Sequence, residues 1–418
     1  MVVAYSGGVD SHVLLHLCQR LGQPLRAVHV HHGLQSQADA WTQHCEHVCE
    51  QLDIELTVLR VDAAPAQGES PEDAARKARY RAIAQVLTAG ECLLTGHHAD
   101  DQAETLLLQL MRGAGTAGLA AMPAYKSFGD YWHGRPLLAY GRSELVAYAT
   151  QQSLHWIEDP SNTDTRFDRN LMRHTILPLL QQRWPAVATS LSRSAALQQE
   201  SLALNETLAR IDLAAVTTDQ ARVLSMTRLQ ALSRTRQINL LRYWWRLHAG
   251  RSPARNQLMQ LVDSLLPAAV DAAPVIKWGN TQIRRFQQRL YLLADNSEDI
   301  STLECGWDGH TTVQLGRNIR VRAEMNCSPG LDRCLLSQKL SLRFRRGGER
   351  MRVFGNAHHQ QLKKLMQDAN IPPWQRARVP LLYINDELAC VCGYWLAEPF
   401  AAKPGEHGWL PVCDYDEA

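Results

Sequence analysis

Along residues 1–184, short apolar runs alternate with segments whose apolar positions recur at helical spacing. Such runs are typical of strands buried on both faces, and the second pattern is typical of amphipathic helices. Strands are expected at 2–5, 25–31, 55–61, 91–96, 135–138 and 154–157, and helices after Asp10 and at 38–52, 71–87 and 101–112. This alternation predicts an α/β fold over residues 1–185, a doubly wound parallel sheet with helices on both faces.

The pattern changes after Pro185. Residues 186–266 are almost wholly helical in spacing, residues 274–293 return to alternation, and residues 295–301 are polar like a linker. Short strands with one helix near residues 360–369 follow. The chain is therefore predicted to hold three domains: an α/β domain at 1–185, a mainly helical domain at 186–295 and a small α+β domain at 305–418.

A glycine-rich turn joins the first expected strand to the first helix. It consists of Ser6, Gly7, Gly8, Val9, Asp10 and Ser11. Two adjacent glycines let backbone N–H groups converge, and the helix directs the positive end of its dipole at the same place. The serine hydroxyls add donors. The turn is therefore expected to bind a phosphate or pyrophosphate, the alternative being a plain Gly-Gly turn capped by Asp10.

The form of this turn limits which phosphate chemistry it serves. No Lys-Ser or Lys-Thr follows the glycines, so the turn is not the loop that holds β- and γ-phosphates for γ-phosphoryl transfer. It also lacks the Gly-x-Gly-x-x-Gly spacing of dinucleotide-binding folds.

Histidines and carboxylates follow two other strands. Three histidines, His29, His31 and His32, end the second strand. No thiol or carboxylate accompanies them at the spacing of metal ligands, so a metal site is not favoured. They are better explained as hydrogen-bonded histidines at a strand end or as ligand contacts. Asp101 and Glu104 are three residues apart and share one face of a helix. They either stabilise the helix N-terminus or hold a cation such as magnesium or a substrate ammonium group, and the second interpretation is favoured.

Basic residues lie on the neighbouring segments. Arg76 and Arg79 share one helix face, and Arg112 ends the helix that carries the carboxylates, so a solvated face and a dipole interaction explain them equally well. The loop at residues 158–173 is dense in Asn, Asp and Arg just past a strand, a composition that suits ligand contact. Its candidate residues are Asn162, Arg169, Asn170 and Arg173.

Composition and charge set broad limits. The chain has 418 residues, 45% of them hydrophobic, and a net charge of only +2, which neither demands nor forbids nucleic acid. No apolar run reaches the roughly 20 residues of a membrane span, and no signal peptide precedes the first strand. The ten cysteines lack the spacing of zinc or redox sites. A cytoplasmic protein with no membrane partner is therefore expected. Whether the natural chain begins before Met1 is left open.

Positive charge is concentrated near the C-terminus. Between Arg333 and Arg378 the acidic residues are Glu349 and Asp368, and the basic ones include Lys339, Arg343, Arg345, Arg346, Arg350, Arg352, Lys363, Lys364 and Arg376. This cluster suits RNA phosphates, although each residue alone is equally explained as solvated surface.

The glycine-rich turn resembles the pyrophosphate loop of the ATP-pyrophosphatase (PP-loop) superfamily, whose fold is adenine nucleotide α-hydrolase-like. More specifically, motifs in this order resemble the long bacterial form of the tRNA(Ile)-lysidine synthase family. The motifs are Ser-Gly-Gly-Val-Asp-Ser from Ser6, His-Gly-Leu from His32, Ala-Arg-Lys-Ala-Arg-Tyr from Ala75, Asp-Asp-Gln-Ala-Glu-Thr from Asp100, and Asp-Pro-Ser-Asn from Asp159 with Arg-Asn-x-x-Arg from Arg169. Further similarity lies at residues 345–350, 363–365 and 371–376, so the resemblance covers nearly the whole chain.

The resemblance implies a two-step reaction on a tRNA(Ile) with a CAU anticodon. ATP adenylates O2 of the wobble cytidine, and the ε-amine of free L-lysine then attacks C2 and displaces AMP, which leaves lysidine. ATP and Mg²⁺ are the implied cofactors. The implied catalytic residues are Asp10, Asp101 and Glu104, with Asp10 and Asp101 at the Mg²⁺ and residues 6–11 with His32 at ATP; which carboxylate holds Mg²⁺ and which holds lysine is left open.

The implied tRNA and substrate contacts are Arg76, Arg79, Arg112, Asn162, Arg169, Asn170, Arg173, Arg345, Arg346, Lys363, Lys364 and Arg376. A homodimer is left open by the sequence. Three alternatives remain: a tRNA thiolase, which would need reactive cysteines or an iron–sulfur site, an amidotransferase-type synthetase, which would need a glutaminase domain, and a non-catalytic RNA-binding module. The carboxylates at their motif positions argue against the last of these.

Overall fold

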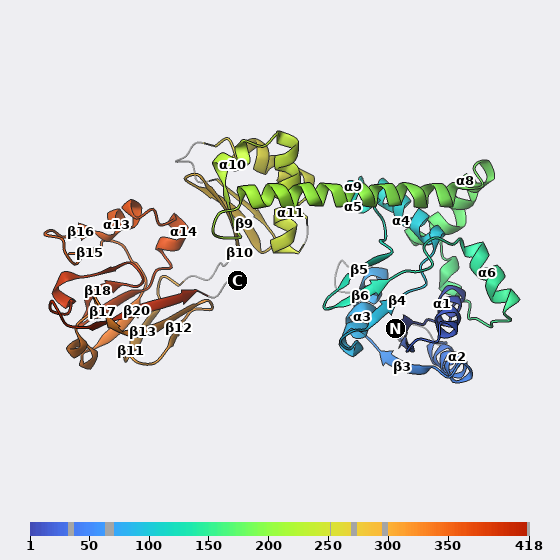
Figure 1. Cartoon of the computed structure of the whole chain (residues 1–418), viewed down its shortest axis with the longest axis horizontal. Coiled ribbons are helices and arrows are strands. Elements are labelled where there is room, and N and C mark those ends of the chain that lie inside the picture. The colour runs from blue at the N-terminus through green and yellow to red at the C-terminus, as the bar shows by residue number, and fades with distance from the viewer. Residues whose placement is uncertain (32–36, 63–70, 251, 269–273, 295–299, 416–418) are drawn as a thin grey trace. The chain divides into compact units, whose positions relative to one another are not determined.

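The computed structural model describes residues 1–31, 37–62, 71–250, 252–268, 274–294 and 300–415. Its contacts divide the chain into two units, residues 1–208 and 209–418, which run from blue to green and from green to red in Figure 1. Each unit has its own sheets and its own buried apolar clusters. No helix in the described ranges is long and apolar enough to cross a membrane.

The first unit is built on a six-stranded sheet with the order β3-β2-β1-β4-β6-β5. The strands are β1 (Val2–Ala4), β2 (Arg26–His31), β3 (Glu55–Arg60), β4 (Cys92–Leu94), β5 (Tyr125–Phe128) and β6 (Tyr131–Gly134). All neighbours pair in parallel except β5 and β6, which form an antiparallel hairpin at the edge. The predicted parallel α/β sheet is confirmed.

Helices cover both faces of this sheet. The helices of the unit include α1 (Val9–Arg20), α2 (Ala38–Gln51), α3 (Pro71–Val86), α4 (Ala99–Met111), α5 (Thr116–Leu119), α6 (Arg142–Gln151), α7 (Asp168–Leu171) and α8 (Leu177–Arg183). Val3 packs in a cluster with apolar residues of α1, α2 and α6, whereas its neighbour Val2 packs on the opposite face with Ile83 of α3. Alternate residues of one buried strand thus feed two cores, as a doubly wound sheet requires.

Two of the expected short strands are wrong. Residues 136–139 form a turn. The strand pair at this edge is the hairpin at 125–134, and because it has many exposed residues, no apolar run marks it in the sequence. Residues 154–157 are extended but join no sheet. Their backbone instead runs past the glycine-rich turn, where Ile157 N donates to Gly7 O at 2.9 Å.

The functional end of the sheet lies where β1 separates β2 from β4. The order of the sheet reverses there, because the chain moves to β2 and β3 on one side and later to β4 on the other. Ligands of open α/β sheets bind outside the carboxyl ends of the strands at such a switch point. The glycine-rich turn follows β1 at this place.

The second unit begins within the long helix α9 (Val187–Val216). A four-stranded antiparallel sheet, β7-β10-β9-β8, packs against its helices around Trp244 and Trp245. The elements are β7 (Val223–Ser225), α10 (Met226–Gln230), α11 (Arg234–Ala249), α12 (Arg255–Gln260), β8 (Val275–Trp278), β9 (Thr281–Phe286) and β10 (Arg289–Ala294). The helices expected at residues 186–266 are therefore present over most of that range. The alternation at 274–293 corresponds to strands β8, β9 and β10 of the sheet.

The rest of the second unit is α+β, as predicted. Its sheets have the orders β11-β14-β17-β18-β19, β12-β13-β20 and β15-β16. The strands are β11 (Glu304–Trp307), β12 (Val313–Leu315), β13 (Ile319–Cys327), β14 (Leu340–Arg343), β15 (Arg350–Met351), β16 (Gln360–Gln361), β17 (Leu381–Ile384), β18 (Glu387–Val391), β19 (Trp395–Leu396) and β20 (Gly408–Tyr415), with helices α13 (Leu362–Asp368) and α14 (Pro373–Arg376).

Candidate active site

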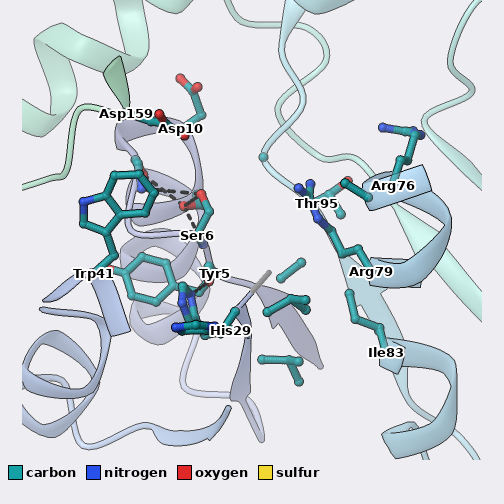
Figure 2. A pocket seen from close by; sticks show the side chains of 18 of the residues that line it. Tyr5, Ser6, Asp10, His29, Trp41, Arg76, Arg79, Ile83, Thr95 and Asp159 are labelled. Atoms are coloured by element: carbon teal, nitrogen blue, oxygen red, sulfur yellow. Dashed lines mark hydrogen bonds between the residues drawn. The ribbon is translucent and has the colours of Figure 1, made fainter. Parts of the chain in front are cut away.

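A pocket of about 500 Å³ opens at the carboxyl ends of β1, β2 and β4. Figure 2 shows Tyr5, Ser6 and Trp41 on one side, and Arg76 and Arg79 of α3 on the other. The glycine-rich turn, one aromatic side chain from α2 and two guanidinium groups therefore line the same space. A polyanionic ligand with a flat base matches this lining in charge and shape.

The glycine-rich turn has the conformation that its glycines allow. Gly7 has φ +84°, and a Cβ added there would lie 2.7 Å from Cδ1 of Ile157. The hydroxyl of Ser11 donates to Gly8 O at 2.9 Å and accepts from Ser6 N at 3.2 Å, while the two serine hydroxyls are 3.0 Å apart. Backbone and hydroxyl groups thus converge at the N-terminus of α1, as an anion cradle requires.

A second close approach joins this turn to the segment that leads into α4. A Cβ added to Gly96 would lie 2.7 Å from the backbone oxygen of Asp10, so only glycine fits between β4 and α1. This contact brings the start of α4 beside the start of α1. His98, the residue before α4, consequently lies close to Asp10.

His98 is the buried centre of a carboxylate cluster. Its Nε2 lies 3.7 Å from Asp10 and 3.3 Å from Asp101, and its Nδ1 lies 3.6 Å from Asp100. Burial disfavours the charged ring, but hydrogen bonds to Asp10 and Asp100 and the charge of Asp101 outweigh it and raise the pKa of His98 to about 10. The raised pKa favours the charged form of His98, whose ring lies beside the carboxylates of Asp10, Asp100 and Asp101.

Asp101 and Glu104 face two arginines from the loop at residues 158–173. Arg169 donates to Glu104 at 2.8 Å and to Asp101 at 3.1 Å, and Arg173 donates to the same two carboxylates at 2.6 Å and 2.9 Å. Glu104 is fully buried. Although burial raises the pKa of Asp101, the charges of His98 and Arg169 outweigh it and keep that pKa below its usual value.

The arginines of this loop were expected to contact RNA or substrate, and the structure gives them a different immediate partner. They neutralise the carboxylate pair that was expected to hold a cation. The sequence spacing placed Asp101 and Glu104 on one helix face correctly, but it gave no sign that residues 65 to 72 positions later would meet them.

Asp10 has one oxygen available to a cation. Its Oδ1 is buried and has no hydrogen-bond partner in the part of the chain that the structure describes, whereas its Oδ2 faces His98. Both oxygens of Asp101 are engaged, one by the arginines and one by the backbone N–H of His98. No cluster of three metal-ligating side chains occurs among the described residues. Asp10 therefore fits a Mg²⁺ that takes its other ligands from phosphates and water.

Two other histidines beside the pocket are neutral. Thr95, next to Gly96, has its hydroxyl 2.7 Å from Nδ1 of His97 and 2.9 Å from Nε2 of His133. Burial is the main cause that lowers the pKa of both rings to about 3, and the positive charge of Arg135 acts in the same direction, while Asp101 partly opposes it at His97. His97 lines the pocket as an uncharged base.

The remaining predicted residues of the first unit lie outside this cluster. Val9 is buried as the first residue of α1, and Asn170 donates to Asp164 O at 2.9 Å. Arg112 caps the C-terminal end of α4, about 16 Å along the helix from Asp101. Asn162 falls in the 3₁₀ segment Pro160–Thr163. His32 lies outside the described residues.

In the C-terminal basic cluster, the paired arginines follow β14. Arg345 lies 3.5 Å from Glu349, and Arg346 pairs with Glu304 at 3.0 Å. The carboxylate of Glu349 also accepts from the N–H of Gly347 at 2.8 Å, which fixes the turn between the two residues.

The other members of the basic cluster lie on two helices. Lys363 and Lys364 are exposed on α13, whose Leu362 and Met366 are buried. Arg376 of α14 is half-buried and donates to Ile371 O at 2.7 Å. Burial and then the charge of Arg345 lower the pKa of Arg376, so these two arginines lie within electrostatic reach of each other.

Sequence reasoning gave no role to three residues. Trp41 lines the pocket, but nothing distinguishes it from the other apolar positions of its helix. His98 was given no role, although a histidine followed closely by two carboxylates, Asp100 and Asp101, could have suggested a charge network. Gln102 holds Met122 through both its amide atoms, at 2.7 and 2.8 Å, a contact with no sequence signal.

Comparisons with known proteins match the chain along most of its length. Residues 1–180 match the model of the PP-loop domain, residues 224–291 the TilS substrate binding domain and residues 340–413 the TilS substrate C-terminal domain. Among solved structures, the U34-tRNA thiolase NcsA from Methanococcus maripaludis, with its [4Fe-4S] cluster, is similar to 47% of this chain, over 71% of its own length, at 19% identity and a TM-score of 0.40.

Curated relatives are much more similar. The tRNA(Ile)-lysidine synthase of Methylococcus capsulatus is 44% identical over 96% of this chain and 93% of that protein. Those of Coxiella burnetii and Serratia proteamaculans are each 43% identical, over 97% and 98% of this chain and 91% and 94% of their own lengths. At this identity and coverage, the chain belongs to the tRNA(Ile)-lysidine synthase family.

Proposed function

We propose that this protein ligates free L-lysine to C2 of the wobble cytidine of tRNA(Ile) with a CAU anticodon, using ATP and releasing AMP and pyrophosphate. One observation carries the proposal beyond family membership. Gly96 packs against the backbone of Asp10, which brings the start of α4, with His98 and its carboxylates, beside the anion cradle after β1. This closeness supports a nucleotide site next to the proposed site for the cationic substrate.

In the first step, the turn from Ser6 to Ser11 binds the pyrophosphate portion of ATP through backbone N–H groups and hydroxyls. Mg²⁺ would be held by Oδ1 of Asp10, and when bound it offsets negative charge on the leaving pyrophosphate. O2 of the cytidine attacks the α-phosphorus, and the bond to the β-phosphate breaks. Asp101 as a second ligand of Mg²⁺ stays a prediction. Both of its carboxylate oxygens already accept hydrogen bonds, one from Arg169 and one from the backbone of His98, and neither is open to a metal ion.

For the second step, Asp101 and Glu104 as the residues that hold the lysine stay a prediction. Arg169 and Arg173 donate to both carboxylates at 2.6 to 3.1 Å, so the arginines would have to release them before they could bind an ammonium group. The ε-ammonium must lose a proton before it attacks C2 and displaces AMP. His97 lines the pocket, but with a pKa of about 3 it is too weak a base to take that proton, so the proton passes to water.

The tRNA must reach the pocket with its wobble base turned out of the stack, which an anticodon loop permits at lower cost than a duplex. Arg76 and Arg79 on the pocket wall are placed to meet its phosphates. Arg112, Asn162 and Asn170 as tRNA contacts stay predictions. The homodimer also stays a prediction, which sedimentation would test. The division into three domains at 1–185, 186–295 and 305–418 stays a prediction as well.

Arg345, Arg346, Lys363, Lys364 and Arg376 are proposed to hold another part of the same tRNA. Their support is the concentration of positive charge in a chain whose net charge is only +2. Any role for His32 in binding ATP also stays a prediction.

The proposal is tested by mass spectrometry of nucleosides from tRNA(Ile) incubated with the protein, ATP, Mg²⁺ and lysine. Lysidine should form, and Asp10→Ala should lower its rate at least 100-fold, because the variant removes the available oxygen beside the phosphate cradle. Far-ultraviolet circular dichroism serves as the folding control. Absence of lysidine with the folded wild type, or a normal rate with Asp10→Ala, would contradict the assignment.

The thiolase alternative has little support in the pocket. Among the described lining residues there is no cysteine, and burial raises the pKa of the Cys45 thiol, near the glycine-rich turn, to about 12. The same mass spectra would show a thiolated nucleoside if that alternative held.

A further inference from the structure

A chain of hydrogen bonds runs from a buried arginine to the wall of the pocket. Arg135 is only 3% exposed, and its Nη2 lies 3.2 Å from Nδ1 of His133. The Nε2 of His133 lies 2.9 Å from the hydroxyl of Thr95, and this hydroxyl lies 2.7 Å from Nδ1 of His97. Thr95 and His97 line the pocket. The chain therefore connects a charge in the interior with the space where the nucleotide is proposed to bind.

Arg135 sets the direction of the first hydrogen bond. A guanidinium group only donates, so Nδ1 of His133 accepts and carries no proton. A doubly protonated ring would also place a second cation 3.2 Å from the guanidinium, and burial is the main cause that lowers the pKa of His133 to about 3. His133 is therefore neutral, carries its proton on Nε2 and donates to the hydroxyl of Thr95.

The backbone around Arg135 holds it in place. Its Nη1 donates to the oxygen of Pro123 at 2.7 Å. Its own N–H donates to the oxygen of Ala124, also at 2.7 Å. The donor that starts the chain is thus fixed by two further hydrogen bonds.

The hydroxyl of Thr95 determines the tautomer of His97 in the same way. It is buried, and among the described residues its hydrogen-bond partners are the rings of His133 and His97. Because it accepts from His133, its own proton goes to Nδ1 of His97; otherwise a buried donor would stay unpaired, which is unfavourable. Burial is the main cause that lowers the pKa of His97 to about 3, so this ring is neutral. Its single proton is therefore on Nε2.

The Nε2–H of His97 is available to a ligand. Among the described residues no group forms a hydrogen bond with this nitrogen, and the atom is accessible from the pocket. His97 directly follows Gly96, which packs on the backbone of Asp10 at the start of α1. Figure 2 shows Thr95 on the side of the pocket opposite Ser6. The donor therefore belongs to the wall that faces the phosphate cradle.

We propose that Arg135, His133 and Thr95 fix His97 as a neutral hydrogen-bond donor, and that its Nε2–H donates to a non-bridging oxygen of the α-phosphate of ATP. The inference rests on the proposed function and deepens it, since it names a donor at the phosphorus that is attacked. A bond forms from O2 of the cytidine to this phosphorus, and the electron pair of the broken bond leaves with pyrophosphate. A fixed donor stabilises the negative charge on the α-phosphate oxygens during this step, and a neutral imidazole provides it while keeping its proton.

The four residues have different roles. His97 touches the substrate and acts as a catalytic residue, whereas Thr95, His133 and Arg135 are positioning residues. NMR of protein labelled with ¹⁵N-histidine tests this order directly. At neutral pH, long-range ¹H–¹⁵N correlations should show both rings with a proton on Nε2 and none on Nδ1, and the signals are assigned by their loss in His97→Leu and His133→Leu. A proton on Nδ1 of His97, or a doubly protonated ring, would overturn the proposal.

Single-turnover kinetics test the contact with the α-phosphate. Transfer of label from [α-³²P]ATP to tRNA(Ile) with lysine omitted measures adenylation alone. His97→Leu should lower this rate about 100-fold, because loss of one donor at a developing charge has this order of effect. The Kd of ATP should change less than about threefold, since the cradle binds the pyrophosphate portion in the ground state. His97→Gln should restore part of the rate, because its amide is also a donor.

Thr95→Val tests positioning without removing the donor. The variant keeps the shape of the side chain but removes the hydrogen bond that orients the ring of His97, so the adenylation rate should fall about tenfold at an unchanged Kd of ATP. Thr95→Ser keeps the hydroxyl and should restore the rate. Thr217→Val is the matched control, since the half-buried hydroxyl of Thr217 donates to Leu213 O at 2.7 Å outside the pocket. Thermal unfolding checks that each variant folds.

A wild-type adenylation rate in His97→Leu would overturn the catalytic contact, and a wild-type rate in Thr95→Val would overturn the positioning. If His97→Leu raised only the KM for lysine, the donor would bind the lysine carboxylate, and the assignment to the α-phosphate would be wrong. Failure of the proposed function is distinguishable from these results, because the wild type itself would then form no adenylated tRNA, whatever the tautomer of His97.

Discussion

At the scale of residues, the site is an arrangement of charges that neutralise one another. Asp101 and Glu104 are buried, and an unpaired buried carboxylate would cost several kcal/mol. Arg169 and Arg173 offset that cost, because each pairs with both carboxylates. The four side chains therefore form one ion-pair network at the start of α4.

Substitution of Glu104 tests its proposed role in holding lysine. Glu104→Gln keeps the shape and removes the charge, so we expect the KM for lysine to rise at least tenfold while ATP-dependent adenylation of the tRNA is less affected. Thermal unfolding should also move to lower temperature, because the two arginines lose a partner. Steady-state kinetics with varied lysine measure the first effect. A wild-type KM would mean that Glu104 only stabilises the helix and its arginines.

A matched control is available at another arginine–carboxylate pair. Glu91 accepts from Arg26 at 2.7 and 2.6 Å, outside the lining of the pocket. Glu91→Gln should lower stability but leave the KM for lysine unchanged, so the two variants separate loss of an ion pair from loss of substrate binding.

Sequence analysis predicted individual residues well only where local spacing determines their geometry. The turn after β1 and the shared face of Asp101 and Glu104 follow from local rules, and both are present. The pairing with Arg169 depends on where a distant loop folds back, which no local rule contains. The same reason explains why Trp41 was missed at the pocket.

At the scale of elements, the Arg26–Glu91 pair ties β2 to the segment before β4. The guanidinium also donates to Val86 O at 2.8 Å, at the end of α3. The hydrogen bond from Arg26 is the main cause that lowers the pKa of Glu91 to about 2. One ion pair thus joins β2, the segment before β4 on the far side of β1, and the end of α3.

This pair gives a pH dependence with a definite sign. Because the pKa of Glu91 is lower in the folded chain than its ordinary value of 4.5, its stabilisation is complete above pH 4.5 and is lost as the pH falls toward 2. Wild type should exceed Glu91→Gln by about 1 kcal/mol in free energy of unfolding at pH 7, and the difference should shrink below pH 4.5. Urea unfolding at several pH values measures it. A difference that grew toward low pH would contradict the assignment.

The elements also show where hydrophobic pattern fails. β1, β2 and β4 are buried on both faces and appear as apolar runs, so they were expected in place. β5 is an edge strand whose Tyr125, Lys126 and Ser127 are all exposed, so it has no such run. Residues 154–157 have the apolar composition of a strand, but their backbone bonds to the turn at Gly7 instead.

At the scale of the whole molecule, charge is distributed unevenly. The chain has 44 basic and 42 acidic residues, yet the stretch from Arg333 to Arg378 is strongly basic. Because the net charge is close to zero, composition alone could not predict a nucleic-acid partner. The concentration of basic residues between Arg333 and Arg378 could. The structure adds that the members differ: Arg345 and Arg346 have carboxylate partners, while Lys363 and Lys364 are exposed on one helix.

Exposed lysines that bind phosphates should change the salt dependence of tRNA binding. Lys363→Glu combined with Lys364→Glu should weaken binding and reduce the slope of log Kd against log salt by about 1.5, since each released phosphate contact contributes 0.7 to 0.9. The fold should tolerate the change because the buried side of α13 is formed by Leu362, Leu365 and Met366. Arg345→Glu with Arg346→Glu should act in the same direction but less cleanly, because it also breaks the ion pairs with Glu349 and Glu304.

Filter binding of tRNA over a salt series decides between an RNA surface and a merely solvated one. Arg20→Glu, at the exposed end of α1 in the first unit, is the control for a change of overall charge. ATP binding should be unchanged in every variant, since the turn from Ser6 to Ser11 belongs to the first unit and α13 to the second. If both double variants kept the wild-type slope, the cluster would be ordinary surface. If Arg20→Glu reduced the slope as much, only the overall charge would matter, because a specific phosphate contact depends on where each cation lies.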